Sequence, residues 1–186
     1  MAINYTRAFV LLITLCTGSN LAAQDRPPAK LLDPDASLSA VLLGTGVPLP
    51  NPDRATACTA VIAGDRVFLV DTGRNCVVPL DQAGIRDIAG VFYTHYHSDH
   101  FIGLGEILLN FGIDGLDRSI PVRGPTGARE VIEGILAAYR LDLKYRVTHH
   151  GEKFSANIMQ PVVTEYEPGV VYEERGLKVT MFTVCH

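Results

Sequence analysis

Residues 94–100, Thr-His-Tyr-His-Ser-Asp-His, bring together side chains that bind metal ions. The potential ligands are His95, His97, Asp99 and His100, in a chain that has only 6 histidines. His95 and His97 are two positions apart, so in extended backbone they point to the same side and can chelate one ion. Asp99 and His100 follow where the chain turns and can face a second ion. Imidazole and carboxylate together suit zinc, and also iron or manganese.

The elements around this loop are predicted to hold it rigidly. An apolar strand over 88–93 precedes it, and a helix over about 104–111 follows it. Two apolar runs split by Gly64-Asp65 predict a hairpin. The other predicted elements are strands over 39–43, 120–122, 158–165, 170–173 and 177–184, and helices over 75–83 and from Thr126 onward. Strands interspersed with helices indicate a sheet covered by helices, in an α/β or layered α+β fold.

The first 23 residues have the pattern of a signal peptide. Arg7 precedes the apolar run 8–15, and small residues at 21–23 offer a cleavage site. The run is shorter than the roughly 20 apolar residues of a membrane span, and no other stretch of the chain is long enough. The alternative is a buried N-terminal strand or helix. We therefore expect export to the periplasm or secretion, with a signal peptide over 1–23, a linker over 24–37 and a domain over 38–186.

Net charge and cysteine content bear on the class of ligand and on disulfide pairing. The net charge of −4 gives no sign of the clustered Lys/Arg face of a basic nucleic-acid binder. Removal of the signal would leave Cys58, Cys76 and Cys185, an odd number. Cys58 and Cys76 could pair in an oxidising compartment, but sequence separation says nothing about distance in space. From the sequence we favour three small, buried, apolar side chains.

Longer motifs carry a family resemblance. THYHSDH resembles the H-x-H-x-D-H signature of the metallo-β-lactamase superfamily. LLGTGVPLPNPDRATACTAVIAGDRVFLVDTG resembles the opening of its ribonuclease Z and arylsulfatase-like branch, and FYTHYHSDHFIGLGEILL resembles that branch's metal loop and following helix. The resemblance covers about Val41 to Asn110 well and the remainder loosely.

The resemblance implies roles for individual residues. His95 and His97 would bind a first metal ion, and Asp99 and His100 a second, with Zn²⁺ expected and Mn or Fe as alternatives. His186, after the last strand, would be the third ligand of the first ion. Asp71, in Val-Asp-Thr-Gly, would be the acid that orients the metal loop, rather than only a strand-end cap. Arg54 would lie near the substrate, although a solvated loop charge is an equal alternative. His149 and His150 fall in a charged loop and are expected to be exposed.

The resemblance also implies a fold and its extent. We expect the metallo-β-lactamase αβ/βα sandwich, with its N-terminal half and part of the second half present. The family also needs a bridging Asp and a last His from farther along the chain, and nothing follows His186. The expectation is a sequence that stops early and that, alone, is an inactive metal-binding fragment.

The implied chemistry is ester hydrolysis by a dinuclear metal site, with Asp99 accepting a proton from water. Because of the export signal, we favour small phosphate, sulfate or other esters as substrates. The alternative is a ribonuclease Z-like endoribonuclease that trims the 3′ ends of transfer RNA precursors, whose substrates are cytosolic. We also expect that the protein can form a homodimer.

Overall fold

The computed structural model describes residues 7–15, 37–151 and 154–185 of the chain. Strand bounds are β1 (Arg7–Leu15), β2 (Leu38–Gly44), β3 (Cys58–Ala63), β4 (Arg66–Val70), β5 (Gly90–Phe92), β6 (Pro121–Gly124), β7 (Val162–Glu165), β8 (Gly169–Glu174) and β9 (Leu177–Cys185). Helix bounds are α1 (Val77–Gln82), α2 (Ser98–Phe101), α3 (Leu104–Ile113) and α4 (Ala128–His150), with a 3-10 turn η2 (Ala156–Met159).

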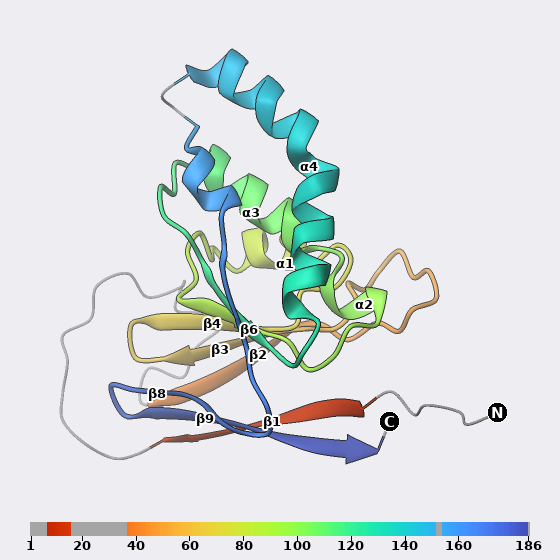
Figure 1. The fold of residues 1–186 in the computed structure, drawn as a ribbon, viewed down its shortest axis with the longest axis vertical. Coiled ribbons are helices and arrows are strands. Elements are labelled where there is room, and N and C mark those ends of the chain that lie inside the picture. The colour runs from red at the N-terminus through yellow and green to blue at the C-terminus, as the bar shows by residue number, and fades with distance from the viewer. Residues whose placement is uncertain (1–6, 16–36, 152–153, 186) are drawn as a thin grey trace.

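Two sheets and a helical layer make up the described fold (Figure 1). The larger sheet has the strand order β2-β3-β4-β5-β6-β7, antiparallel from β2 to β4 and parallel from β4 to β7. The smaller sheet has the order β1-β9-β8 and is antiparallel. α1, α3 and α4 cover one face of the larger sheet, and the smaller sheet lies on the other. The expected layered fold is therefore present.

Each layer is held by its own apolar core. The helices bury a cluster against the larger sheet, in which Leu69, Val91, Leu104, Leu108 and Ile132 are fully enclosed. Between the two sheets lies a smaller cluster that includes Phe68 and Phe92 from one sheet and Leu177, Val179 and Met181 from the other. Burial of apolar surface on both faces explains why β4 and β5 read as continuous apolar runs rather than alternating ones.

Several predicted elements are confirmed, and others need correction. The hairpin around Gly64 and the helix after the metal loop form as predicted. The segment 158–165 was predicted to be one antiparallel strand, but it begins with η2, and β7 pairs in parallel with β6. His149 and His150 were placed in a loop, but they form the last turn of α4, where they are exposed as expected.

The N-terminal segment contributes a strand in this structure. β1 lies within the predicted signal peptide and pairs along its length with β9. The cleavage site at 21–23 and the linker positions 24–36 lie outside the described residues. Removal of residues 1–23 therefore stays a prediction. Within the described ranges, no helix has the length and apolar character needed to cross a membrane.

Candidate metal centre

The metal loop emerges from the carboxyl end of β5, in the middle of the larger sheet. Parallel pairing on both sides fixes the end of this strand, and Tyr93 N–H donates to the carbonyl of Arg123. Residues 94–97 then form neither helix nor strand, with a bend at Thr94 and extended backbone at His97, and α2 begins at Ser98. The sequence prediction treated this whole stretch as a loop, but Asp99 and His100 lie within the short helix α2.

Asp71 is the acceptor that organises the histidines. The residue is 5% exposed, and its backbone has a φ of 60°, a left-handed conformation that aspartate tolerates better than most residues. Oδ1 accepts from Thr94 N–H at 2.9 Å, and Oδ2 accepts from the Thr94 hydroxyl at 2.8 Å. Oδ2 also accepts from His100 Nδ1 at 2.7 Å. The role predicted for Asp71, to orient the metal loop, therefore has a direct geometric basis.

These bonds assign the ring tautomers. Because His100 Nδ1 carries the proton donated to Asp71, its Nε2 is the nitrogen suited to a metal, and it lies 3.7 Å from Asp99 Oδ2. The Thr94 hydroxyl donates its only proton to Asp71, so it is the acceptor in its hydrogen bond with His95 Nδ1–H at 3.0 Å. Nε2 is then the unprotonated nitrogen of the His95 ring, the one that could accept a hydrogen bond or bind a metal ion.

The two histidines of the first pair face one another as metal ligands do. With its proton on Nδ1, His95 accepts at Nε2 a hydrogen bond from His97 Nδ1–H at 2.9 Å, and a metal ion would take the place of that proton. Two nitrogens bound to one tetrahedral zinc are roughly 3.3 Å apart, given zinc–nitrogen distances of about 2.0–2.1 Å. A small opening of this pair would therefore admit an ion. The ring of His100 packs beside His95, with 4.1 Å between the centroids.

Two of the four predicted ligands in the loop are buried. His95 is 4% and Asp99 8% exposed, while His97 is open to solvent. Burial alone would lower the pKa of His100, but its hydrogen bond to Asp71 and the charges of Asp71 and Asp99 raise that pKa above its ordinary value. Burial also raises the pKa of Tyr93, whose hydroxyl lies 2.6 Å from Thr72 Oγ1 and stays protonated.

The imidazoles and the carboxylate of the loop are donors of the kind that divalent metal ions bind. Among the residues that the structure describes, no three His, Cys, Asp or Glu side chains enclose a single ion. His186, the predicted third ligand of the first ion, lies outside the described residues. The paired imidazoles of His95 and His97 are nonetheless donors of the kind that zinc binds.

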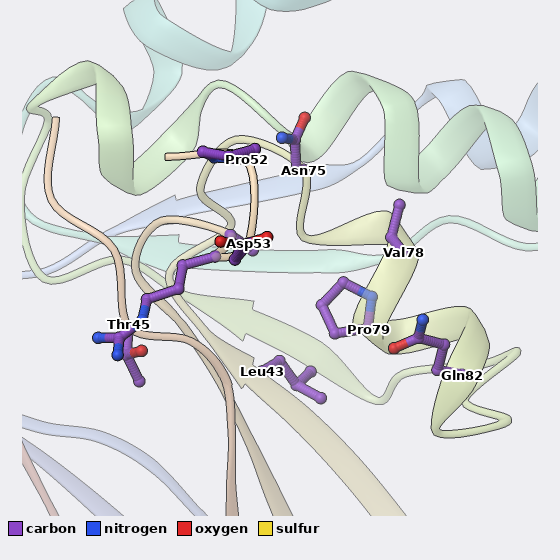
Figure 2. Close-up of a pocket in the computed structure, with 10 residues that line it drawn as sticks. Leu43, Thr45, Pro52, Asp53, Asn75, Val78, Pro79 and Gln82 are labelled. Carbon is purple, nitrogen blue, oxygen red and sulfur yellow. The ribbon is translucent and has the colours of Figure 1, made fainter. Parts of the chain in front are cut away.

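Arg54 lies in the proline-rich loop between β2 and β3. It is exposed and lines a pocket of about 370 Å³ between the proline-rich loop and α1 (Figure 2). The polar side chains of Thr45, Asp53, Asn75 and Gln82 also line this pocket, and none of the predicted ligands does. Contact of Arg54 with a substrate stays a prediction.

Two features of the site were missed or misjudged from the sequence. Cys58 and Cys76 form a disulfide between the start of β3 and the residue before α1, which corrects the expectation of apolar thiols. Both are fully buried, while Cys185, also expected to be buried, is exposed and unpaired. Thr56 contacts the metal loop across 43 residues of sequence. No sequence signal indicated that contact, because proximity between distant segments is set by the fold.

A family model described as the metallo-beta-lactamase superfamily matches residues 51–117. Ribonuclease Z of Mycobacterium marinum is 37% identical over 153 residues, covering 78% of this chain and 53% of the relative. Ribonuclease Z of Mycobacterium bovis (BCG Pasteur) is 36% identical over 156 residues, covering 80% of this chain and 54% of the relative. The chain thus spans about half the length of the curated relatives it matches.

Solved structures agree with the sequence relatives. The short form of human tRNase Z superposes with a TM-score of 0.53 at 26% identity, over 68% of this chain and 44% of that one. A metallo-beta-lactamase fold protein from Bacillus subtilis has a TM-score of 0.53 at 17% identity, over 73% of this chain and 48% of that one, and shows the fold alone. With its H-x-H-x-D-H loop at a strand end, the chain belongs to the metallo-β-lactamase superfamily. Within that superfamily it falls in the ribonuclease Z branch.

The role of Asp71 can be tested by its conversion to asparagine. Asp71→Asn keeps the size and the tolerance of a left-handed backbone, but it removes the charge and one acceptor atom. We expect the affinity for Zn²⁺ to fall by about 10- to 100-fold, as for other outer partners of metal-bound histidines. Isothermal titration calorimetry measures this, with Asp65→Asn, which breaks only a surface pair with Arg175, as the matched control. Equal affinity in Asp71→Asn and wild type would show that Asp71 does not orient the ligands.

Proposed function

We propose that this protein is a metal-dependent phosphodiesterase of the ribonuclease Z type, acting on RNA. The observation that carries the proposal is the Asp71 network, in which Thr94 and Asp71 hold the Nδ1 atoms of His95 and His100 and so set the orientation of both rings. The similarity to curated ribonuclease Z proteins supports a phosphodiester in preference to a sulfate ester. This reverses the preference for small esters that the N-terminal segment suggested.

The residues divide the chemistry among them. His95 and His97 would hold one ion, with His186 as a further ligand, and Asp99 and His100 would hold the other. When bound, the two ions acidify the attacking water and neutralise charge on the phosphate. Asp99, at 8% exposure, would hold that water and accept its proton. Asp71 would keep the ring of His100 in position throughout.

Substrate contact is proposed for Arg54. Its exposed guanidinium extends from the loop between β2 and β3, which also carries Thr56 beside the metal loop. A guanidinium can pair with two oxygens of a phosphate group at once. We therefore assign Arg54 to the RNA backbone rather than to the reacting phosphate.

A second candidate is an exported hydrolase of small phosphate esters. The buried Cys58–Cys76 disulfide favours it, because disulfides persist in oxidising compartments. Export, through removal of residues 1–23 and release to the periplasm or medium, is part of this second proposal. It differs from the first in substrate and in location, while the metal chemistry is the same.

One experiment separates the two. The protein expressed from its full reading frame is loaded with Zn²⁺ and assayed on a transfer RNA precursor with a 3′ extension, on bis(p-nitrophenyl) phosphate and on p-nitrophenyl sulfate. We expect endonucleolytic cleavage of the precursor and no sulfate release. Turnover of the small phosphodiester alone, with a mature N-terminus near Gln24 by mass spectrometry, would favour the exported hydrolase. No turnover of any phosphodiester by the zinc-loaded protein would refute the proposal.

A further inference from the structure

The metal loop is held by its backbone as well as by Asp71. The carbonyls of Asp99, His100 and Phe101 accept, in order, from Thr56 Oγ1 at 2.7 Å, Thr72 N–H at 2.7 Å and Thr72 Oγ1 at 3.3 Å. In the other direction, Gly103 N–H donates to the carbonyl of Thr72 at 2.9 Å. We call these bonds, together with those of Thr56 to Arg74, the loop brace. The loop brace fixes the turn that carries Asp99 and His100.

Thr56 is the most distant donor in the loop brace. Its side chain is 1% exposed, and its hydroxyl both accepts from Arg74 N–H at 2.7 Å and donates to the Asp99 carbonyl at 2.7 Å. Its backbone N–H also donates to the carbonyl of Arg74 at 3.1 Å. One hydroxyl thus joins three segments: the end of the loop between β2 and β3, the turn before α1, and α2. A threonine hydroxyl can donate one hydrogen bond and accept another, so it can pair with the Asp99 carbonyl and the Arg74 N–H at the same time.

The space around this hydroxyl is full. A Cβ atom placed on Gly73 would lie 2.2 Å from Thr56 Oγ1 and 2.4 Å from the Asp99 carbonyl oxygen. A water molecule needs a cavity of roughly 10–15 Å³ and at least two polar partners. In a valine variant the added methyl group would occupy the place of the hydroxyl, so a water molecule could not take over its hydrogen bonds from that position. Loss of the hydroxyl would therefore leave the Asp99 carbonyl and Arg74 N–H unpaired.

We infer that Thr56 is a positioning residue, which sets the location of the Asp99 carboxylate and the His100 ring through the backbone of α2. Asp71 fixes the rotation of the His100 ring, whereas Thr56 fixes where the main chain carries both ligands. Metal sites and catalytic groups tolerate displacements of only about 0.5 Å before function suffers. The inference rests on the proposed function only in treating Asp99 and His100 as ligands.

The test compares Thr56→Val with Thr56→Ser. Valine keeps the branched shape and removes the hydroxyl, while serine keeps the hydroxyl and removes a methyl group. The matched control is Thr59→Val, which makes the same change within β3 and outside the loop brace. Amide hydrogen exchange of Thr72, Arg74 and Gly103, read by NMR on the metal-free chain, is one readout. Titration with Co²⁺, followed by its visible absorption, is the other.

We expect about tenfold faster exchange at these amides in Thr56→Val, with wild-type rates in Thr56→Ser and Thr59→Val. Cobalt affinity should fall by about 10- to 100-fold in Thr56→Val and be restored by serine. Unchanged exchange in Thr56→Val, or equal losses in the serine and valine variants, would overturn the inference. If wild-type protein bound no Co²⁺, the proposed function would fail, and the exchange rates alone would decide the role of Thr56.

Discussion

Alanine at His95 or His97 is expected to remove one metal ion and to reduce phosphodiester hydrolysis to the uncatalysed background. The two ring nitrogens, His95 Nε2 and His97 Nδ1, lie 2.9 Å apart, which is close enough for both to bind one ion after a small opening of the pair. When one imidazole of a chelating pair is removed, the metal ion loses a second bond that the fold had already positioned. The affinity for the ion therefore falls by much more than a factor of two. Metal content by elemental analysis and turnover of the RNA precursor, both on the full reading frame, measure the effect.

The chain provides its own control for this prediction. His149 and His150 are exposed at the last turn of α4, far from the metal loop in the fold. Alanine at either should leave zinc stoichiometry and turnover unchanged, which excludes a general effect of removing an imidazole. Full zinc content in both His95→Ala and His97→Ala would contradict the ligand assignment, whatever the activity.

The part of the site that the sequence could predict is local in the chain. His95, His97, Asp99 and His100 fall within one strand–loop–helix unit, so their spacing alone brings them together. The role of Asp71 came from the family resemblance, and in the structure its two oxygens accept from Thr94 and His100. Reading 94–100 as a loop missed α2, since four residues are too few to show a helical period.

The parts that the sequence could not predict depend on contacts between distant segments. Thr56 and Asp99 are 43 residues apart, and Cys58 and Cys76 are 18 apart. Neither pair has a sequence pattern that encodes its distance, which arises only when the β3–β4 hairpin is packed beside β5. β7 was assigned an antiparallel pairing for the same reason. Its residues alternate as any edge strand does, and only the crossover through α4 makes its pairing with β6 parallel.

Loss of the Cys58–Cys76 disulfide is expected to lower the free energy of unfolding by roughly 3 kcal/mol, from the chain entropy of a closed loop of this size. The bond closes a loop of 18 residues that contains the β3–β4 hairpin, Asp71 and Thr72. Cys58→Ala/Cys76→Ala tests this by urea denaturation followed by circular dichroism. The midpoint should move to lower urea concentration, and thermal unfolding should shift down by about 6–12 °C for a chain of this length.

Removal of two buried sulfurs also costs packing, so a second measurement isolates the covalent bond. Wild-type protein unfolded and refolded under reducing conditions keeps both sulfur atoms and lacks only the bond, and it should show most of the same loss. Cys185→Ser, at an exposed position, should leave the midpoint unchanged. Because Asp71 and Thr72 lie inside the closed loop, the reduced protein should also exchange the Thr72 and Gly103 amides faster, which links oxidation to the order of the metal loop. Labelling of both Cys58 and Cys76 by a thiol reagent in the native protein, purified without reductant and then denatured, would show that the bond does not form and that this stabilisation has another source.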